Sequence, residues 1–160
     1  MRQYGLTYKA NKSYLQKENL FYNYSDAAYT NTEEYWFTLG YICLANGAAI
    51  TWISKKQTTV ILSSTEAKYM ALYEAVHEAI WIKTLYKELG YQQEQPVLIL
   101  GDNNRSIIMA KNPGFHKQSK HIIIRWHWLQ DRIQDKSVYL DDCHDPQNMG
   151  DICTNQITHP

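Results

Sequence analysis

The stretch LSSTEAKYMALYEA, residues 62–75, is where the chain changes from a strand pattern to a helix pattern. Beyond Ser63, apolar residues recur at helical spacing until Gly90 provides a stop, which predicts one long helix. Ser63 followed three positions later by Glu66 fits a capping box, in which the glutamate bonds back to the serine amide. Glu66 therefore has two interpretations, as a cap residue or as part of a reaction centre. The positions of the other acidic residues are needed to choose between these two interpretations of Glu66.

Three strands are expected before this helix. Residues 20–26 alternate in polarity and are rich in aromatic side chains, as in a half-buried strand. Residues 36–45 and 48–56 are two further strand-type runs, separated by Asn46-Gly47, which is a strong hairpin signal.

Two strands and three helices are expected after it. PVLIL, residues 96–100, is a short apolar run typical of a strand buried on both faces. Helices are predicted over 104–111 and 120–134, a last strand over 137–143, and a short helix from about residue 147. The order β-β-β-α-β-α-α-β-α predicts an α/β fold, a mixed five-stranded sheet with helices on both faces.

The bulk properties predict one globular domain, residues 1–160. The chain is 44% hydrophobic, and 16 basic residues balance 16 acidic ones, so nucleic-acid binding would depend on local clusters. Cys43, Cys143 and Cys153 have no metal-type spacing and suggest reduced thiols of an intracellular protein, cytoplasmic or nuclear. No apolar run reaches the roughly 18 residues of a membrane span.

Four carboxylates occupy informative positions in this layout. Asp26 ends the first strand, Glu66 lies in the first turn of the long helix, Asp102 follows the buried strand, and Asp151 lies in the last helix. If the first and fourth strands are neighbours, Asp26 and Asp102 emerge together and Glu66 can overhang both. Clustered carboxylates disfavour joint ionisation unless cations compensate them, and Mg²⁺ prefers such oxygen ligands. Each acid taken alone also fits a structural role, as a turn residue, a cap or a solvated helix acid.

Several short sequence motifs, taken in order, resemble those of a known family. They are YSDA, ITWISKKQTTVILSSTEAKYMAL, GDNN followed by AKNP, SKHIIIRWHWLQD, and NMGDICT. Together they resemble the ribonuclease H domain at the end of copia-type LTR retrotransposon polyproteins. Within residues 1–19, RQYGLTYK resembles the segment that leads into this domain from the reverse transcriptase. The resemblance spans nearly the whole chain, and the STEA word with its SKKQ lead is its most specific part.

The resemblance implies a ribonuclease H-like fold and a function. It implies that Asp26, Glu66, Asp102 and Asp151 are metal-binding carboxylates, holding two Mg²⁺ ions for which Mn²⁺ could substitute. It further implies a two-metal-ion hydrolysis of the RNA strand of an RNA/DNA hybrid, with 3′-hydroxyl and 5′-phosphate products. A reverse transcriptase or another polyprotein segment is then the expected protein partner, and no membrane is expected.

Substrate contacts are expected beside the acids. The 2′-hydroxyls of RNA could be recognised by Ser25, Asn103 and the backbone around Ala27. Basic residues could contact phosphates, although a solvated basic face is an equal alternative for each; they are Lys55, Lys56, Arg105, Lys111, Lys117, Lys120 and Arg125. The spacing of His116, His121 and His127 argues against a zinc site.

One further catalytic candidate is His144, seven residues before Asp151. It matches the mobile-loop histidine of cellular ribonucleases H in role, although not in motif. Assistance in proton transfer or product release is the corresponding hypothesis.

The chain departs from the family pattern at several positions. The second acid of YSDADW is Ala28, the second glutamate of STEAEY is Lys68, and a basic pair is replaced by Tyr35-Trp36. Loss of the basic pair removes expected phosphate contacts. An alternative function is therefore a catalytically weak or inactive nucleic-acid-binding or assembly module. A DNA integrase or exonuclease is disfavoured by the four-acid order with STEA on the first helix.

Overall fold

The computed structural model describes residues 5–8, 21–29, 37–57, 63–112, 120–143 and 147–155, with the backbone alone for residues 120–122. Within these residues no helix is both long enough and apolar enough to cross a bilayer.

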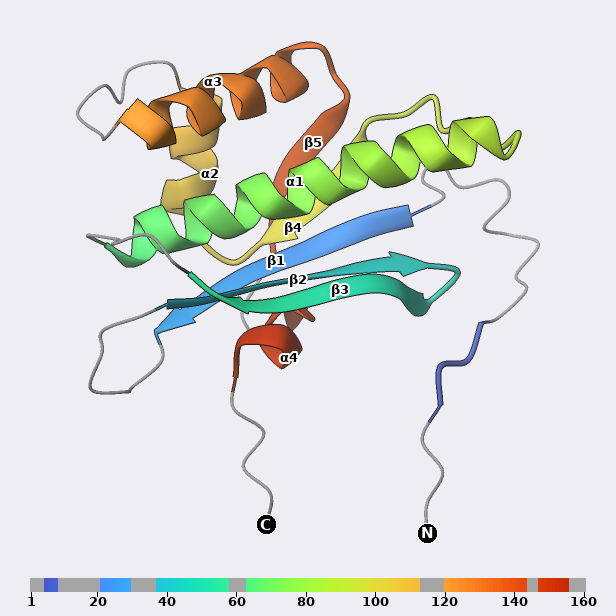
Figure 1. Cartoon of the computed structure of the whole chain (residues 1–160), viewed down its shortest axis with the longest axis horizontal. Coiled ribbons are helices and arrows are strands. Elements are labelled where there is room, and N and C mark those ends of the chain that lie inside the picture. Colours follow the sequence, from blue (N-terminus) through green and yellow to red (C-terminus); the bar gives the residue numbers. More distant parts are fainter. Residues whose placement is uncertain are drawn as a thin grey trace, which may run out of the picture.

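The core of the fold is a five-stranded mixed sheet, as the sequence predicted (Figure 1). Its strands lie in the order β3-β2-β1-β4-β5. The first three are antiparallel neighbours, whereas β4 is parallel to both β1 and β5. The strand bounds are β1 Phe21–Tyr29, β2 Phe37–Ala45, β3 Ala48–Lys56, β4 Val97–Gly101 and β5 Val138–Asp142.

The β2–β3 hairpin turns at the expected dipeptide. Asn46 and Gly47 both have positive φ, 52° and 77°. A two-residue hairpin turn matches the twist of its strands when both of its residues have positive φ. Asn and Gly adopt positive φ at little energetic cost. The hairpin prediction is confirmed.

In the part of the chain that the structure describes, four helices pack on the two faces of the sheet, in the predicted order. Helices α1, α2 and α3 cover one face and α4 lies on the opposite face (Figure 1). Their bounds are α1 Ser64–Glu88, α2 Asn104–Lys111, α3 Lys120–Gln134 and α4 Asp151–Thr154. The prediction of helices on both faces is confirmed.

Two predicted boundaries were wrong by three or more residues, and the bounds of β4 and β5 differ from the predicted ones by a single residue. Strand β1 continues to Tyr29 instead of ending at Asp26, because β2 pairs with it as far as Tyr29–Phe37. Helix α4 begins at Asp151 instead of near residue 147. The side chain of Asn148 accepts a hydrogen bond from the Gly150 amide, and such a local bond competes with helix formation.

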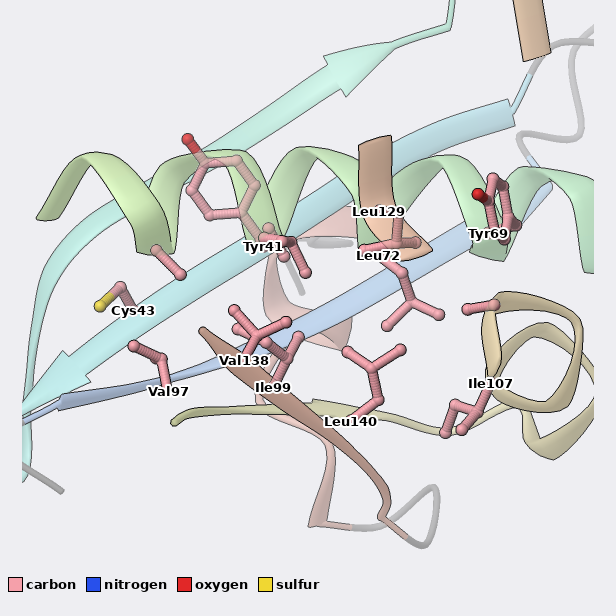
Figure 2. Close-up of a cluster of buried hydrophobic side chains, with 14 of the residues drawn as sticks. Tyr41, Cys43, Tyr69, Leu72, Val97, Ile99, Ile107, Leu129, Val138 and Leu140 are labelled. Atoms are coloured by element: carbon pink, nitrogen blue, oxygen red, sulfur yellow. The ribbon is translucent and has the colours of Figure 1, made fainter. Parts of the chain in front are cut away.

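Helix α1 lies close to the sheet because one face of it carries small residues. Ala67, Ala71, Ala75 and Ala79 recur every four positions and are all fully buried. Larger side chains fill the space between α1, α3 and the sheet; Figure 2 shows Tyr69, Leu72, Val97, Ile99, Leu129, Val138 and Leu140 among them. This packing holds the first turns of α1 beside the ends of β1 and β4.

Candidate metal centre

The neighbouring inner strands β1 and β4 place two of the predicted carboxylates close together. The strands are parallel, and Ser25 is the register partner of Gly101. Asp26 follows Ser25 within β1, and Asp102 directly follows Gly101, the last residue of β4. The two aspartates therefore lie side by side. The first and fourth strands are neighbours, which meets the condition under which Asp26 and Asp102 were expected to emerge together.

Helix α4 adds a third carboxylate to this pair. Asp26, Asp102 and Asp151 each offer a carboxylate oxygen, and these oxygens lie within 4.8 Å of one another. Asp151 reaches them from the face opposite α1, as the first residue of α4. Residues separated by up to 125 positions thus form one acidic group, hereafter the carboxylate group.

Two glycines allow α4 to come so close to the sheet. A Cβ atom at Gly40 on β2 would lie 2.5 Å from Cys153 Cβ, which is too short for any real contact. A Cβ atom at Gly150 would lie 3.0 Å from the Asp26 amide nitrogen. The absence of side chains at both positions is therefore a condition for placing Asp151 beside Asp26.

Asn148 fixes the segment that leads into α4, a role that was not predicted from the sequence. Its Nδ2 donates to the Ser25 carbonyl oxygen at 3.1 Å, and its Oδ1 accepts from the Gly150 amide at 3.0 Å. The side chain is buried, so both bonds are shielded from water. An Asn two residues before Gly is a known turn pattern, but nothing in the sequence shows its partner on β1.

Thr154 was also missed. Its hydroxyl donates to Asp26 Oδ2 from the last residue of α4. A hydroxyl hydrogen bond to a carboxylate is charge-assisted and fixes the orientation of the carboxylate plane. The second oxygen, Asp26 Oδ1, is thereby directed toward α1.

Lys68 on α1 meets these oxygens. Its Nζ lies 3.3 Å from Asp26 Oδ1 and also donates to Asp102 Oδ2. Burial alone would lower the pKa of the Lys68 ammonium, but the hydrogen bond to Asp102 and the charges of Asp102 and Asp26 outweigh burial and raise the pKa above its usual value. Lys68 is therefore a charged partner of the carboxylate group.

Glu66 is buried on α1 but is not a member of the carboxylate group defined by these distances. The serine half of the predicted cap is confirmed, because Ser63 Oγ accepts a hydrogen bond from the Glu66 amide at 3.1 Å. The structure thus brings together three of the four predicted carboxylates. The role of Glu66 as a ligand stays a prediction.

The small polar candidates for substrate binding have structural contacts of their own. Ser25 is buried, with its hydroxyl 3.4 Å from the Leu100 carbonyl oxygen. Ala27 is buried against α1. Asn103 caps α2 by accepting a hydrogen bond from the Ser106 amide at 2.9 Å. Of the three, Asn103 is the more accessible beside the carboxylate group.

The basic candidates are distributed over several elements. Lys55 and Lys56 are exposed at the end of β3, and Arg105 is exposed on α2. Lys111 lies over the Tyr139 ring and Arg125 over the Tyr73 ring, each 5.3 Å from the ring centroid. Several other predicted residues, the aromatic pair included, lie outside the described part of the chain; they are Tyr35, Trp36, His116, Lys117 and His144. For Lys120 and His121 the backbone alone is described.

The donor set of the carboxylate group fits a divalent cation of the Mg²⁺ type. All three donors are carboxylates, which are hard oxygen ligands. The side chains of Asp26 and Asp102 are only 6% and 8% exposed, so their negative charges lie close together with little water. Such an arrangement needs positive charge nearby, which a bound cation can supply.

Comparison with curated proteins relates the chain to retrotransposon polyproteins. It is 36% identical over 118 residues to the retrovirus-related Pol polyprotein from transposon TNT 1-94 of Nicotiana tabacum, across 74% of this chain. It is 34% identical over 136 residues to the Pol polyprotein from transposon RE2 of Arabidopsis thaliana, across 84% of this chain. The chain spans 9% of the length of each. No protein-family model matches it.

Comparison with solved structures gives the fold. LC11-RNase H1 in complex with an RNA/DNA hybrid matches with a TM-score of 0.57 and 13% identity, over 84% of this chain and 94% of that chain. The N-terminal RNase H domain of rv2228c from Mycobacterium tuberculosis matches with a TM-score of 0.57 and 11% identity, over 84% and 90%. The chain is therefore related in sequence to a segment of retrotransposon Pol polyproteins, and it has the ribonuclease H fold.

Proposed function

We propose that the chain is a metal-dependent endoribonuclease that hydrolyses the RNA strand of RNA/DNA hybrids. The observation that carries the proposal is the convergence of Asp26 on β1, Asp102 directly after β4 and Asp151 on α4, in a ribonuclease H fold. The sequence similarity to Pol polyproteins supports the proposal, because these relatives are named as retrovirus-related Pol polyproteins of transposons.

The carboxylates of this chain would act by holding Mg²⁺, with Mn²⁺ as a substitute. When bound, such ions polarise a phosphoryl oxygen and lower the pKa of an attacking water. Asp26, Asp102 and Asp151 would supply the ligand oxygens, with Glu66 proposed as a fourth. Thr154 would hold the plane of the Asp26 carboxylate, and Asn148 would hold α4 at the correct distance from β1. The proposed products carry 3′-hydroxyl and 5′-phosphate ends.

Recognition of the hybrid is proposed to use its shape and its 2′-hydroxyls. Asn103 adjoins Asp102 and is the best placed of the small polar candidates, since Ser25 and Ala27 are buried. The Ala27 contribution would come from its backbone. Exposed Lys55, Lys56 and Arg105 would contact phosphates without reading sequence. His144 is retained as a proposed aid to proton transfer or product release.

The chain is proposed to act as a single domain, residues 1–160, within or after release from a longer polyprotein. Its short share of each relative's length supports that placement. A reverse transcriptase segment is the proposed neighbour.

A second candidate is a nucleic-acid-binding or assembly module without useful catalysis. One observation favours it, which is the Lys68 ammonium between Asp26 and Asp102. A lysine at this place compensates the acids without any metal.

Cleavage of a labelled RNA/DNA hybrid distinguishes the two candidates. The wild-type chain is incubated with hybrid, duplex RNA or duplex DNA in Mg²⁺ or Mn²⁺, and in EDTA. We expect cleavage of the RNA strand of the hybrid alone, lost in EDTA and in Asp102→Asn. Asp131→Asn is the matched control, because Asp131 is an exposed acid on α3 away from the carboxylate group. Hybrid binding without cleavage under all metal conditions would support the second candidate.

A further inference from the structure

A positive charge of the chain itself already lies inside the carboxylate group. Lys68 Nζ contacts one oxygen of Asp26, at 3.3 Å, and one oxygen of Asp102. These two residues come from neighbouring parallel strands, so the ammonium bridges the pair that forms the floor of the site. The bridging position is the one in which a shared cation would be expected.

The position of Lys68 is set by the fold and is not that of a loose surface side chain. Its neighbour Ala67 is fully buried against Ala27 and Leu39, and the Ala67 carbonyl accepts a hydrogen bond from Gln57 Nε2 at 3.2 Å. The Lys68 side chain is only 21% exposed. The first turns of α1 therefore hold the Lys68 ammonium at the carboxylates, and the Lys68 side chain loses conformational entropy in this position.

The charge balance then differs from that of a site made of carboxylates alone. Asp26, Asp102 and Asp151 bring three negative charges, and Lys68 cancels one of them. One divalent ion neutralises what is left on these three carboxylates, and Glu66, proposed above as a fourth ligand, would add one negative charge to this count. A second divalent ion would have to enter beside both the first ion and the ammonium, where like charges a few ångström apart repel strongly in partly buried surroundings.

We propose that Lys68 supplies one of the cationic positions of the site, so that the chain binds one divalent ion with the lysine in place of a second. This inference rests on the proposed function only for the presence of a divalent ion at the carboxylates. It assigns Lys68 as a positioning and specificity-determining residue for ion uptake. In this chain the lysine replaces a glutamate of the family word, which makes its charge a property of this sequence.

Counting bound ions tests the proposal without any substrate. Mn²⁺ is titrated into metal-free protein, with isothermal calorimetry for affinity and electron paramagnetic resonance for the free ion. We expect one Mn²⁺ in the wild-type chain and in Lys68→Arg, two in Lys68→Gln, and none in Asp102→Asn. Lys87→Gln is the matched control, since Lys87 is an exposed lysine at the other end of the same helix. It should bind as the wild type does.

Thermal unfolding of the same variants gives a second readout. Without metal, Lys68→Gln should melt below the wild type and below Lys87→Gln, because Asp26 and Asp102 lose the ion pair with the Lys68 ammonium. With saturating Mn²⁺ its melting temperature should rise by more than that of either, as expected when a ligand binds the folded state more extensively. A lower rise counts against the proposal.

Two outcomes overturn it. One is a wild-type count of two ions, which would mean that Lys68 is displaced on loading. The other is a Lys68→Gln count no higher than that of the wild type. Should Lys68→Gln fail to fold, the wild-type count alone still decides. Failure of the wild type to cleave a hybrid would affect the proposed function and leave the ion count unchanged, so the two failures are distinguishable.

Discussion

The side-chain amide of Asn148 donates a hydrogen bond to the backbone carbonyl of Ser25 over 3.1 Å, across 123 positions of the chain. Ser25 immediately precedes Asp26, and Asn148 lies three residues before Asp151. The bond therefore joins the two segments that each carry a carboxylate of the group. A single buried amide sets how far α4 stands from β1.

Replacement of Asn148 with Ala should lower both stability and metal uptake. The Ser25 carbonyl would lose its buried partner, at a cost of about 1–3 kcal/mol in the free energy of unfolding. Denaturant unfolding in EDTA measures this, and Mn²⁺ titration measures the loss of affinity as Asp151 moves. Asn148→Asp keeps the acceptor for Gly150 but removes the donor, so it should be no better than Asn148→Ala. Unchanged stability in both variants would contradict the role given to Asn148.

Replacement of Gly40 with Ala should displace α4. The new methyl group would lie 2.5 Å from Cys153 Cβ, so the helix must shift, at about 1–3 kcal/mol of overpacking strain. Gly101→Ala is the comparison variant, because its methyl group would meet the flexible end of Leu72 at 3.3 Å and Ser25 Oγ at 3.4 Å, with no backbone contact that close. Thermal or denaturant unfolding should rank Gly40→Ala as the less stable of the two. The reverse order would show that α4 is not held closely against β2.

Replacement of Thr154 with Val removes the hydroxyl that donates to Asp26 while preserving side-chain shape. Hydrogen bonds to charged groups contribute about 1.5–3 kcal/mol, so the metal-free variant should lose stability of that order. Thr154→Ser keeps the hydroxyl and should lose much less. Denaturant unfolding in EDTA separates the two, and equal losses would indicate that the methyl group matters instead of the hydrogen bond.

The stability of the protein should fall above about pH 10 because of two buried tyrosines. Burial raises the pKa of Tyr69, and burial together with the nearby Glu78 charge raises the pKa of Tyr41. The unfolded phenols ionise near their ordinary pKa while the folded ones stay neutral. Their stabilising contribution is thus complete below pH 10 and is lost as the pH rises further.

Tyr69→Phe tests this cause directly. The Tyr69 hydroxyl is buried and has no hydrogen-bond partner among the described residues. Its removal should leave stability at pH 7 unchanged or raise it by about 1 kcal/mol, and should flatten the fall above pH 10. Tyr91→Phe, at an exposed tyrosine, is the control and should follow the wild-type pH profile. A Tyr69→Phe profile as steep as the wild type would assign the alkaline loss to other groups.

The elements and their order were predictable from the amino-acid sequence, because they follow from local patterns. Alternating strands, the Asn46-Gly47 turn and the Ser63 cap depend on residues within a few positions of one another, and the structure contains each of them. The apolar run at residues 96–100 indicated a strand buried on both faces, and β4 does lie between β1 and β5. Boundaries were less predictable, since β1 is prolonged by its partner β2.

Which charged groups come into contact depends on the packed three-dimensional fold. Asp26, Asp102 and Asp151 converge, Glu66 stands outside their group, and Lys68 enters it. The sequence marked Lys68 as a departure from the family pattern but contained no sign of its partners. The physical reason is that these contacts depend on the distance between α1, α4 and the sheet. Close packing sets that distance through residues far away in the chain, among them Gly40 and Asn148.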